Sequence, residues 1–248
     1  VEDCTLKLDQ FEKALERRPK ITAFGYASNA VGTINPVRKM TEMAHAAGAL
    51  VYVDAVQYAP HGPIDVQSLG VDFLVCSAYK FFGPHAAALY GRYELLDGLK
   101  AYKVRPAPDL PPGKFETGTQ NHEGIAGVLG ALEYLEWLGK TFGAAQEEGL
   151  CEGGYRGRRL ELKKAMTAIR AYEFELSRLL LETLTGIPGL RLYGLADPRR
   201  LDQRVPTFSF TLEGMPPRQL AERLAAEDIY AWDGNYYALE VTSHLGLE

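Results

Sequence analysis

The chain has 248 residues, of which 46% are hydrophobic and 24% are charged. This composition is typical of a protein that buries a core, and it excludes a disordered, collagen-like or coiled-coil chain. The 27 basic and 32 acidic residues give a net charge of −5, which argues against nucleic acid or an anionic membrane surface as the main partner. No apolar run approaches the roughly 20 residues that a membrane helix needs.

The three cysteines, Cys4, Cys76 and Cys151, lie far apart and form no CxxC pair. This pattern predicts reduced thiols in a cytoplasmic protein rather than a disulfide framework. The five histidines have no metal-ligand spacing with one another or with the cysteines, so no metal site is expected. The common glycine-rich nucleotide-binding motifs are also absent from the sequence.

The first half of the chain predicts strands that alternate with helices. A surface helix is expected at 9–18 and a buried strand at 20–27, followed by a polar loop. Asn35 and Pro36 are suited to the N-cap and first position of the next helix, which Gly48 ends. Continuous apolar strands are then expected at 49–53, 71–76 and 86–90, which indicates an α/β fold with a largely parallel sheet covered on both faces.

The second half is more helical and ends in a different pattern. A proline-rich excursion at 100–114 precedes a helix at 123–138, and six glycines mark a connection at 139–157. A long helix at 158–184 is followed by alternating strands at 190–193 and 205–212, a helix at 217–227 and a strand at 229–232. We therefore expect a large domain at 1–140, a connection at 141–157 and a small α+β domain at 158–248.

Polar side chains lie at or just past the carboxyl ends of the predicted strands, where ligands bind in parallel sheets. Asp54 and Lys80 end two successive strands, which places a carboxylate and an amine at one edge. Pyridoxal 5′-phosphate needs such a pair, because a lysine forms the Schiff base and an acid keeps the pyridine nitrogen protonated. Hydroxyls beside the lysine suit a phosphate, and nearby amides suit the phenolic oxygen of the ring. The residues that form this pattern are Asn29, Asp54, Gln57, Ser77, Tyr79 and Lys80.

Four ordered motifs give the chain a family resemblance: Ser28–Pro36, Val53–Gln57, Ser77–Pro84 and Glu116–Asn121. Together they resemble the class V aminotransferase family of fold type I, on its cysteine desulfurase-like branch. The resemblance extends from about residue 20 to residue 138 and is weaker beyond. It implies a fold type I large domain, a small C-terminal α+β domain and pyridoxal phosphate as cofactor.

The resemblance also implies a role for each matching residue. Lys80 corresponds to the lysine that holds the cofactor as an aldimine and shuttles the Cα proton, and Asp54 to the acid on the pyridine nitrogen. Asn29 and Gln57 correspond to the amides near the phenolic oxygen, while Ser77 and Tyr79 lie where phosphate is bound. Thr119 corresponds to a threonine that reaches the cofactor phosphate of the neighbouring subunit, which implies a homodimer with shared sites.

The sequence departs from the desulfurase pattern in three ways. Tyr79 stands where desulfurases usually have histidine. The region comparable to their nucleophilic cysteine loop is 232–238, and no cysteine follows Cys151. A tyrosine hydroxyl cannot take sulfur from a substrate as a thiolate does. Finally, the family's N-terminal part and extreme C-terminus, which supply the ring-stacking and substrate-carboxylate residues, are expected to lie outside this sequence.

We therefore predict an enzyme that acts on an amino-acid substrate through an aldimine and a Cα carbanion, of aminotransferase or lyase type. Transamination, β-elimination and epimerisation all remain open. One alternative is a catalytically silent homologue that serves as a binding or regulatory partner. Another is an ordinary α/β protein whose edge residues only resemble the motif.

Overall fold

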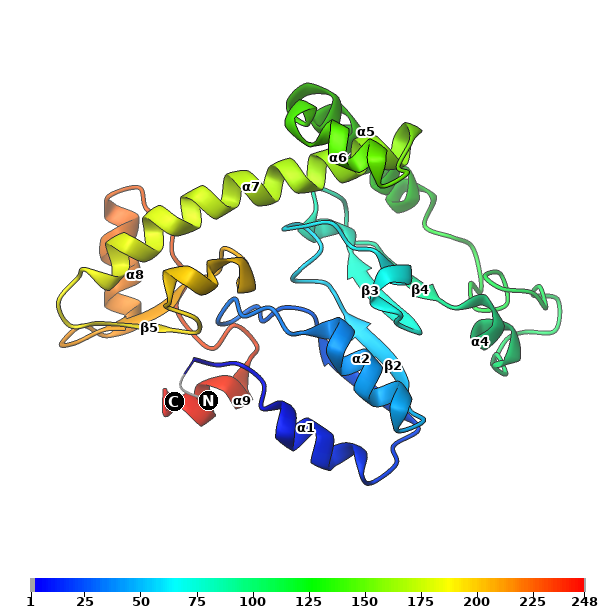
Figure 1. Ribbon diagram of the computed structural model, residues 1–248, viewed down its shortest axis with the longest axis horizontal. Helices are drawn as coiled ribbons and strands as arrows, with labels where there is room; N and C mark the ends of the chain where they lie inside the picture. Colours follow the sequence, from blue (N-terminus) through cyan, green and yellow to red (C-terminus); the bar gives the residue numbers. More distant parts are fainter. Residues whose placement is uncertain (1–2, 248) are drawn as a thin grey trace. The chain divides into compact units, whose positions relative to one another are not determined.

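The computed structural model describes residues 3–247, which fold into two compact units (Figure 1). The sheet unit contains Leu8–Tyr26 and Pro36–Arg170, and the hairpin unit contains residues 3–7, 27–35 and 171–247. The chain thus changes unit four times: before residue 8, at both ends of the segment 27–35, and within the long helix α7 (Gly157–Thr185).

A four-stranded sheet with the order β1-β2-β3-β4 forms the centre of the sheet unit. β1 (Ile21–Gly25), β2 (Leu50–Asp54) and β3 (Phe73–Ser77) are parallel, which confirms the prediction of a mostly parallel sheet. β4 (Ala87–Gly91) runs antiparallel to β3. The short segment between β3 and β4 explains this direction, because a parallel crossover needs roughly a dozen residues or more.

Apolar side chains on one face of this sheet pack beneath α1 (Leu8–Leu15) and α2 (Val37–Ala46). Val51 and Val53 of β2 are completely buried, and the core continues through the edge-to-face pair of Phe11 and Phe24, whose ring centres are 6.0 Å apart. Such burial stabilises by about 25 cal/mol per Å² of apolar surface removed from water. The shorter helices of this unit are α3 (Val66–Leu69), α4 (Tyr93–Gly98) and α6 (Glu147–Glu152).

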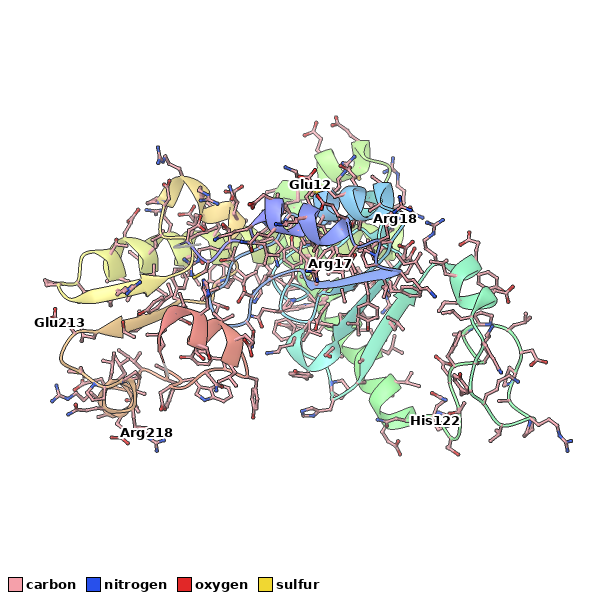
Figure 2. All side chains as sticks on the ribbon, turned by 90° about the horizontal axis from the view of Figure 1, so that it is seen from below. Glu12, Arg17, Arg18, His122, Glu213 and Arg218 are labelled. Atoms are coloured by element: carbon pink, nitrogen blue, oxygen red, sulfur yellow. The ribbon has the colours of Figure 1, made fainter. Side chains whose placement is uncertain are left out.

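Several helix boundaries differ from those expected from the sequence, and α1 ends at Leu15 rather than at residue 18. Pro36, not Asn35, is the N-cap of α2. Helix α5 (His122–Phe142) continues four residues past the expected end at 138, through Gly139. Figure 2 shows His122 at the start of α5 and Glu12 on α1, with Arg17 and Arg18 just beyond that helix.

The hairpin unit is built on the antiparallel pair of β5 (Leu190–Tyr193) and β6 (Ser209–Leu212). Its helices include α8 (Pro217–Ala226) and α9 (Leu239–Leu245). Glu213 directly follows β6, and Arg218 lies in the first turn of α8 (Figure 2). The strand expected at 229–232 is wrong: these residues have no strand partner, and Ile229, Tyr230 and Trp232 are exposed. Among residues 3–247, no helix combines the length and apolar character that a membrane span requires.

Candidate active site

Lys80 lies in a tight turn that directly follows β3. The turn is the 3-10 helix η1 (Ala78–Lys80), and it is closed by hydrogen bonds from the backbone amides of Phe81 and Gly83 to the Ala78 carbonyl, at 2.9 and 2.8 Å. Ala78 is buried, and a β-carbon at Gly83 would lie 2.7 Å from the Ala78 β-carbon. Only glycine therefore allows this close return of the chain, which fixes the backbone that carries Lys80.

The amine of Lys80 is exposed and available. Within the described part of the chain, its Nζ makes no hydrogen bond and no ion pair, and it lies 5.4 Å from the centre of the Tyr79 ring. Tyr79 in turn stacks on His85, with ring centres 5.3 Å apart and planes inclined by 21°. The stacked pair of Tyr79 and His85 supports one side of the turn. Among residues 3–247, no carboxylate forms an ion pair with the Lys80 amine.

Asp54 is the last residue of β2 and is exposed at the carboxyl end of the sheet. In the strand register it pairs with Gly25 of β1 and with Val75 of β3, two residues before Ser77. Its Oδ1 accepts a hydrogen bond from the amide of Val56 at 2.9 Å, which orients the carboxylate. Asp54 and the turn after β3 therefore follow neighbouring parallel strands at the same edge.

Ser77, Gln57 and Thr119 are the other predicted residues of the sheet unit. Ser77 ends β3, opposite Ala87 of β4, and is half-buried. Gln57 is half-buried in the turn that follows β2, so it lies at the same edge as Asp54. Thr119 is exposed in the loop before α5, close in sequence to Asn121, whose side chain accepts a hydrogen bond from the Gly124 amide at 2.9 Å and caps the helix.

Two stacked tyrosines at this edge were not recognised from the sequence. Tyr26 follows β1 and Tyr58 follows Gln57, and their rings are 3.9 Å apart and almost parallel, at 6°. Burial, followed by the neighbouring Tyr58, raises the pKa of Tyr26 well above its usual range, so its phenol stays protonated. The only signal in the sequence is that Tyr26 directly follows β1 and Tyr58 lies four residues after the end of β2.

Asn29 belongs to the hairpin unit, unlike the other predicted site residues. Its Nδ2 donates a hydrogen bond to the backbone oxygen of Tyr236 at 2.8 Å. The loop that carries it is held by the Ser28 hydroxyl, which accepts from the amide of Val31 at 3.2 Å, and by the hydrogen bond from the Ser28 amide to the Thr33 oxygen at 2.9 Å. The partner of the Asn29 amide, a residue 207 positions later, was not foreseen.

The thiols of the chain do not form an activated nucleophile at this edge. Cys76 lies one residue before Ser77, and burial raises the pKa of its thiol, which keeps it protonated. Among residues 3–247, no group of three histidine, cysteine or acidic side chains is arranged to hold a metal ion. The groups at this edge of the sheet unit are an amine, a carboxylate, hydroxyls and the Gln57 amide, which suit an organic phosphate cofactor.

Comparison with known proteins identifies the family. The family profile described as aminotransferase class-V matches residues 1–157, so the chain belongs to the class V aminotransferase family. The cysteine desulfurase of Synechococcus elongatus is 33% identical over 255 residues, which are 98% of this chain and 36% of that protein. A probable cysteine desulfurase of Halalkalibacterium halodurans is 31% identical over 250 residues, 95% of this chain and 53% of that protein.

Solved structures confirm the predicted fold class. A cysteine desulfurase from Thermococcus onnurineus NA1 has a TM-score of 0.71 at 27% identity and covers all of this chain, which spans 57% of that protein. The cysteine desulfurase CsdA from Escherichia coli has a TM-score of 0.74 at 26% identity, over 97% of this chain and 55% of its own. The chain thus spans between 36% and 57% of the length of these relatives.

Proposed function

We propose that this chain is part of a pyridoxal phosphate-dependent enzyme that acts on an amino-acid substrate, with Lys80 as its cofactor lysine. The observation that carries the proposal is that a lysine and an aspartate lie at the same edge of the sheet. Lys80 and Asp54 follow adjacent parallel strands, and the Lys80 amine has no ion pair within residues 3–247. Membership of the class V aminotransferase family supports the same conclusion.

The side chains present fit this cofactor. When bound, pyridoxal phosphate supplies a carbonyl carbon that condenses with amines and a ring that takes up the electrons of the bond broken in the substrate. Asp54 is suited to hold the pyridine nitrogen in its protonated form, because its carboxylate is exposed and oriented by Val56. The remaining assignments are Ser77 and Tyr79 for the phosphate, Asn29 and Gln57 for the phenolic oxygen, and Thr119 for the phosphate held by a neighbouring subunit.

Lys80 would then serve the reaction twice. Its amine would hold the cofactor, and in the presence of a substrate the same amine would take and return the Cα proton. The closed turn from Ala78 to Gly83 holds its backbone, so proton transfer needs rotation of the side chain alone. The exposed position of Lys80 leaves room for a substrate to approach.

The reaction is proposed to be of aminotransferase or lyase type rather than persulfide formation. The named relatives are cysteine desulfurases, but no cysteine lies between Cys151 and Glu248. Burial raises the pKa of the Cys76 thiol and keeps it protonated, so Cys76 is not suited to act as a thiolate nucleophile.

Two further properties belong to the same proposal. A homodimer with shared active sites follows from the assignment of Thr119 to a neighbouring subunit. A cytoplasmic location follows from the cysteines, because all three are free thiols.

The test is the absorbance spectrum of the purified protein with pyridoxal phosphate, before and after borohydride reduction. We expect a yellow band that reduction bleaches and a pyridoxyl group on the peptide that contains Lys80. The K80A variant should lack both, whereas K39A, which removes an exposed lysine on α2, should retain them. A pyridoxyl group on another lysine would refute the assignment of Lys80, and the absence of any band would refute the proposed function.

A further inference from the structure

A cavity of about 400 Å³ lies within the sheet unit, between the segment 63–67 and the first turns of α7. Its size is in the range that holds a small organic molecule. Every residue that lines it belongs to the sheet unit, and none of them is proposed to hold the cofactor. Its apolar lining includes Ile64, Leu162 and Met166, and its charged lining consists of Asp65, Arg159 and Lys163.

The spacing of residues along α7 gives the cavity a wall that is both basic and apolar. Side chains spaced i, i+3, i+4 and i+7 lie on one face of a helix, and here they are Arg159, Leu162, Lys163 and Met166. Leu162 and Met166 are half-buried, so part of their apolar surface stays open to the cavity. On the segment 63–67, Ile64 packs against the core of the sheet unit and provides a second apolar wall. An apolar group in the cavity would therefore be removed from water on both sides.

The charges that line the cavity do not balance, because two cations share one carboxylate. Asp65 Oδ2 lies 3.3 Å from Nη2 of Arg159 and 3.7 Å from Nζ of Lys163. The same carboxylate also accepts from the Tyr155 hydroxyl at 3.1 Å and caps α3 through its other oxygen. Among the residues that line the cavity, one positive charge therefore has no carboxylate of its own.

Lys163 is the cation with the weaker contacts. Its side chain is only 14% exposed, and an ammonium group has three N–H donors to satisfy. Nζ donates to the Ile64 oxygen at 3.3 Å, which is long for a hydrogen bond, and Asp65 lies farther away still. Burial, reinforced by Arg159, lowers the pKa of Lys163 against the opposing effect of Asp65. An anion beside Nζ would give this mostly buried cation a closer partner.

We propose that this cavity is a binding site for a small carboxylic acid with an apolar body, whose carboxylate lies beside Lys163 and Arg159 and whose body packs against the apolar side chains of α7. Ammonium and guanidinium groups bind carboxylates through strong, charge-assisted hydrogen bonds. One carboxylate balances the single excess positive charge, whereas a phosphate brings further negative charge. A neutral ligand would leave the excess charge unbalanced, and an acid without an apolar body would leave the apolar walls in water. The inference does not depend on the proposed function.

The test is isothermal titration calorimetry of the full chain in the presence of pyridoxal phosphate, with three probes. 4-Methylpentanoate has a carboxylate and a branched apolar body, 4-methylpentanamide has the body without the charge, and acetate has the charge without the body. We expect 4-methylpentanoate to bind at least about ten-fold more tightly than either of the others. Equal binding of the amide, or no binding of 4-methylpentanoate at millimolar concentrations, would overturn the inference.

Two substitutions should change the affinity in opposite directions, which separates an effect on the cavity from a loss of fold. K163M keeps an apolar stem but removes the charge, so it should weaken the binding of 4-methylpentanoate by at least about ten-fold. D65N removes the carboxylate that competes for both cations, so it should strengthen the same binding by about three-fold or more. K39M, at an exposed lysine of α2, is the matched control and should leave the affinity unchanged.

Two further variants test the apolar wall and the location of the site. L162A should weaken the binding of 4-methylpentanoate by at least about three-fold and leave that of acetate unchanged. K80A should bind 4-methylpentanoate as the unmodified protein does, because Lys80 does not line the cavity. An unchanged affinity in K163M, a lowered affinity in D65N or a loss of binding in K80A would overturn the inference. The absence of a cofactor band would refute the proposed function alone, since the calorimetry measures the cavity directly.

Discussion

At the residue scale, substitution of Asp54 tests most directly whether activity needs a negative charge at the end of β2. It ends β2, its carboxylate is exposed, and its Oδ1 is oriented by the Val56 amide. Replacement by asparagine keeps the shape of the side chain but removes the negative charge that we propose holds the pyridine nitrogen. We expect D54N to bind pyridoxal phosphate and to lose activity by about a hundred-fold or more, as when one preorganised electrostatic partner is removed.

The control for this prediction is D9N, which removes an exposed aspartate in the first turn of α1. Activity and cofactor absorbance are measured for both variants at the same pH. Full activity in D54N would mean that Asp54 does not face the pyridine nitrogen.

Some single residues were predictable from the sequence and others were not. Asp54 and Lys80 were placed at one edge because each ends a continuous apolar strand, and parallel strands put their carboxyl ends together. Their roles toward the cofactor stay predictions. The hydrogen bond from Asn29 to Tyr236 could not be predicted from the sequence, because it joins two loops 207 positions apart that have no periodic pattern.

At the scale of elements, the crossing of α5 and α7 depends on a glycine. A β-carbon on Gly139 would overlap the carbonyl oxygen of Glu161 and come within 2.8 Å of its carbon. Backbone atoms cannot move aside as a flexible side chain can, so G139A should destabilise the protein by about 1–3 kcal/mol or more. Urea unfolding measures the loss.

The same helix provides the matched control. Gly130 is exposed, and a β-carbon there would meet no atom within 4 Å. G130A should therefore stabilise by up to about 1 kcal/mol through helix propensity alone. Equal effects of the two substitutions would contradict the close crossing of these helices.

Asp65 joins α3 to the start of α7 and makes part of the stability depend on pH. Its carboxylate caps α3 through the amides of Gln67 and Ser68, and it also accepts from the Tyr155 hydroxyl at 3.1 Å. The Ser68 amide first, then Tyr155 and the Lys163 ammonium, lower the pKa of Asp65 below its usual 3.8 against the opposing effect of burial. The stability from this charge is present above pH 3.8 and is lost as the pH falls through the lower pKa of the folded state.

D65N keeps a capping side chain but removes the charge, so it should unfold more easily than the unmodified protein at pH 7. The difference should shrink toward zero as the pH falls below 3.8. D65A should cost about 1 kcal/mol more at pH 7, because it also removes the cap. D97N, at an exposed aspartate of α4, serves as the control. A difference that does not change with pH would contradict the lowered pKa.

Elements with a strong pattern were predictable, and those that depend on partners were not. The apolar runs of β1, β2 and β3 were recognised because each is continuous and has the length of a strand, although β1, at the edge of the sheet, contains no buried residue. Residues 229–232 are also a short apolar run, but no strand lies beside them in the described part of the chain, so the pattern alone did not make a strand. The expected end of α5 at 138 was too early because Gly139 resembles a helix stop, whereas it permits a close helix contact.

At the scale of the whole molecule, each compact unit is assembled from stretches of the chain that are not consecutive. The hairpin unit takes residues 27–35 from the middle of the predicted large domain, and α7 contributes to both units. Prediction from sequence divides a chain into consecutive domains. It therefore gives no indication that the nine residues 27–35 belong to a different compact unit from the residues on either side of them. The boundary predicted at 141–157 stays a prediction. Asn29 and Lys80 consequently belong to different units although both carry motifs of the same family.

Because the three cysteines are free thiols, we predict that a reducing agent does not change the stability of the protein. Cys4, Cys76 and Cys151 are all free, so the fold depends on burial and hydrogen bonds rather than on covalent links. The urea unfolding midpoint should be the same with and without a reducing agent, since a native disulfide would contribute about 2–4 kcal/mol. Alkylation in denaturant without reductant should modify all three thiols, and mass spectrometry counts them. A midpoint lowered by reductant, together with fewer than three modified thiols, would reveal a disulfide and contradict the reduced, cytoplasmic state proposed for this protein.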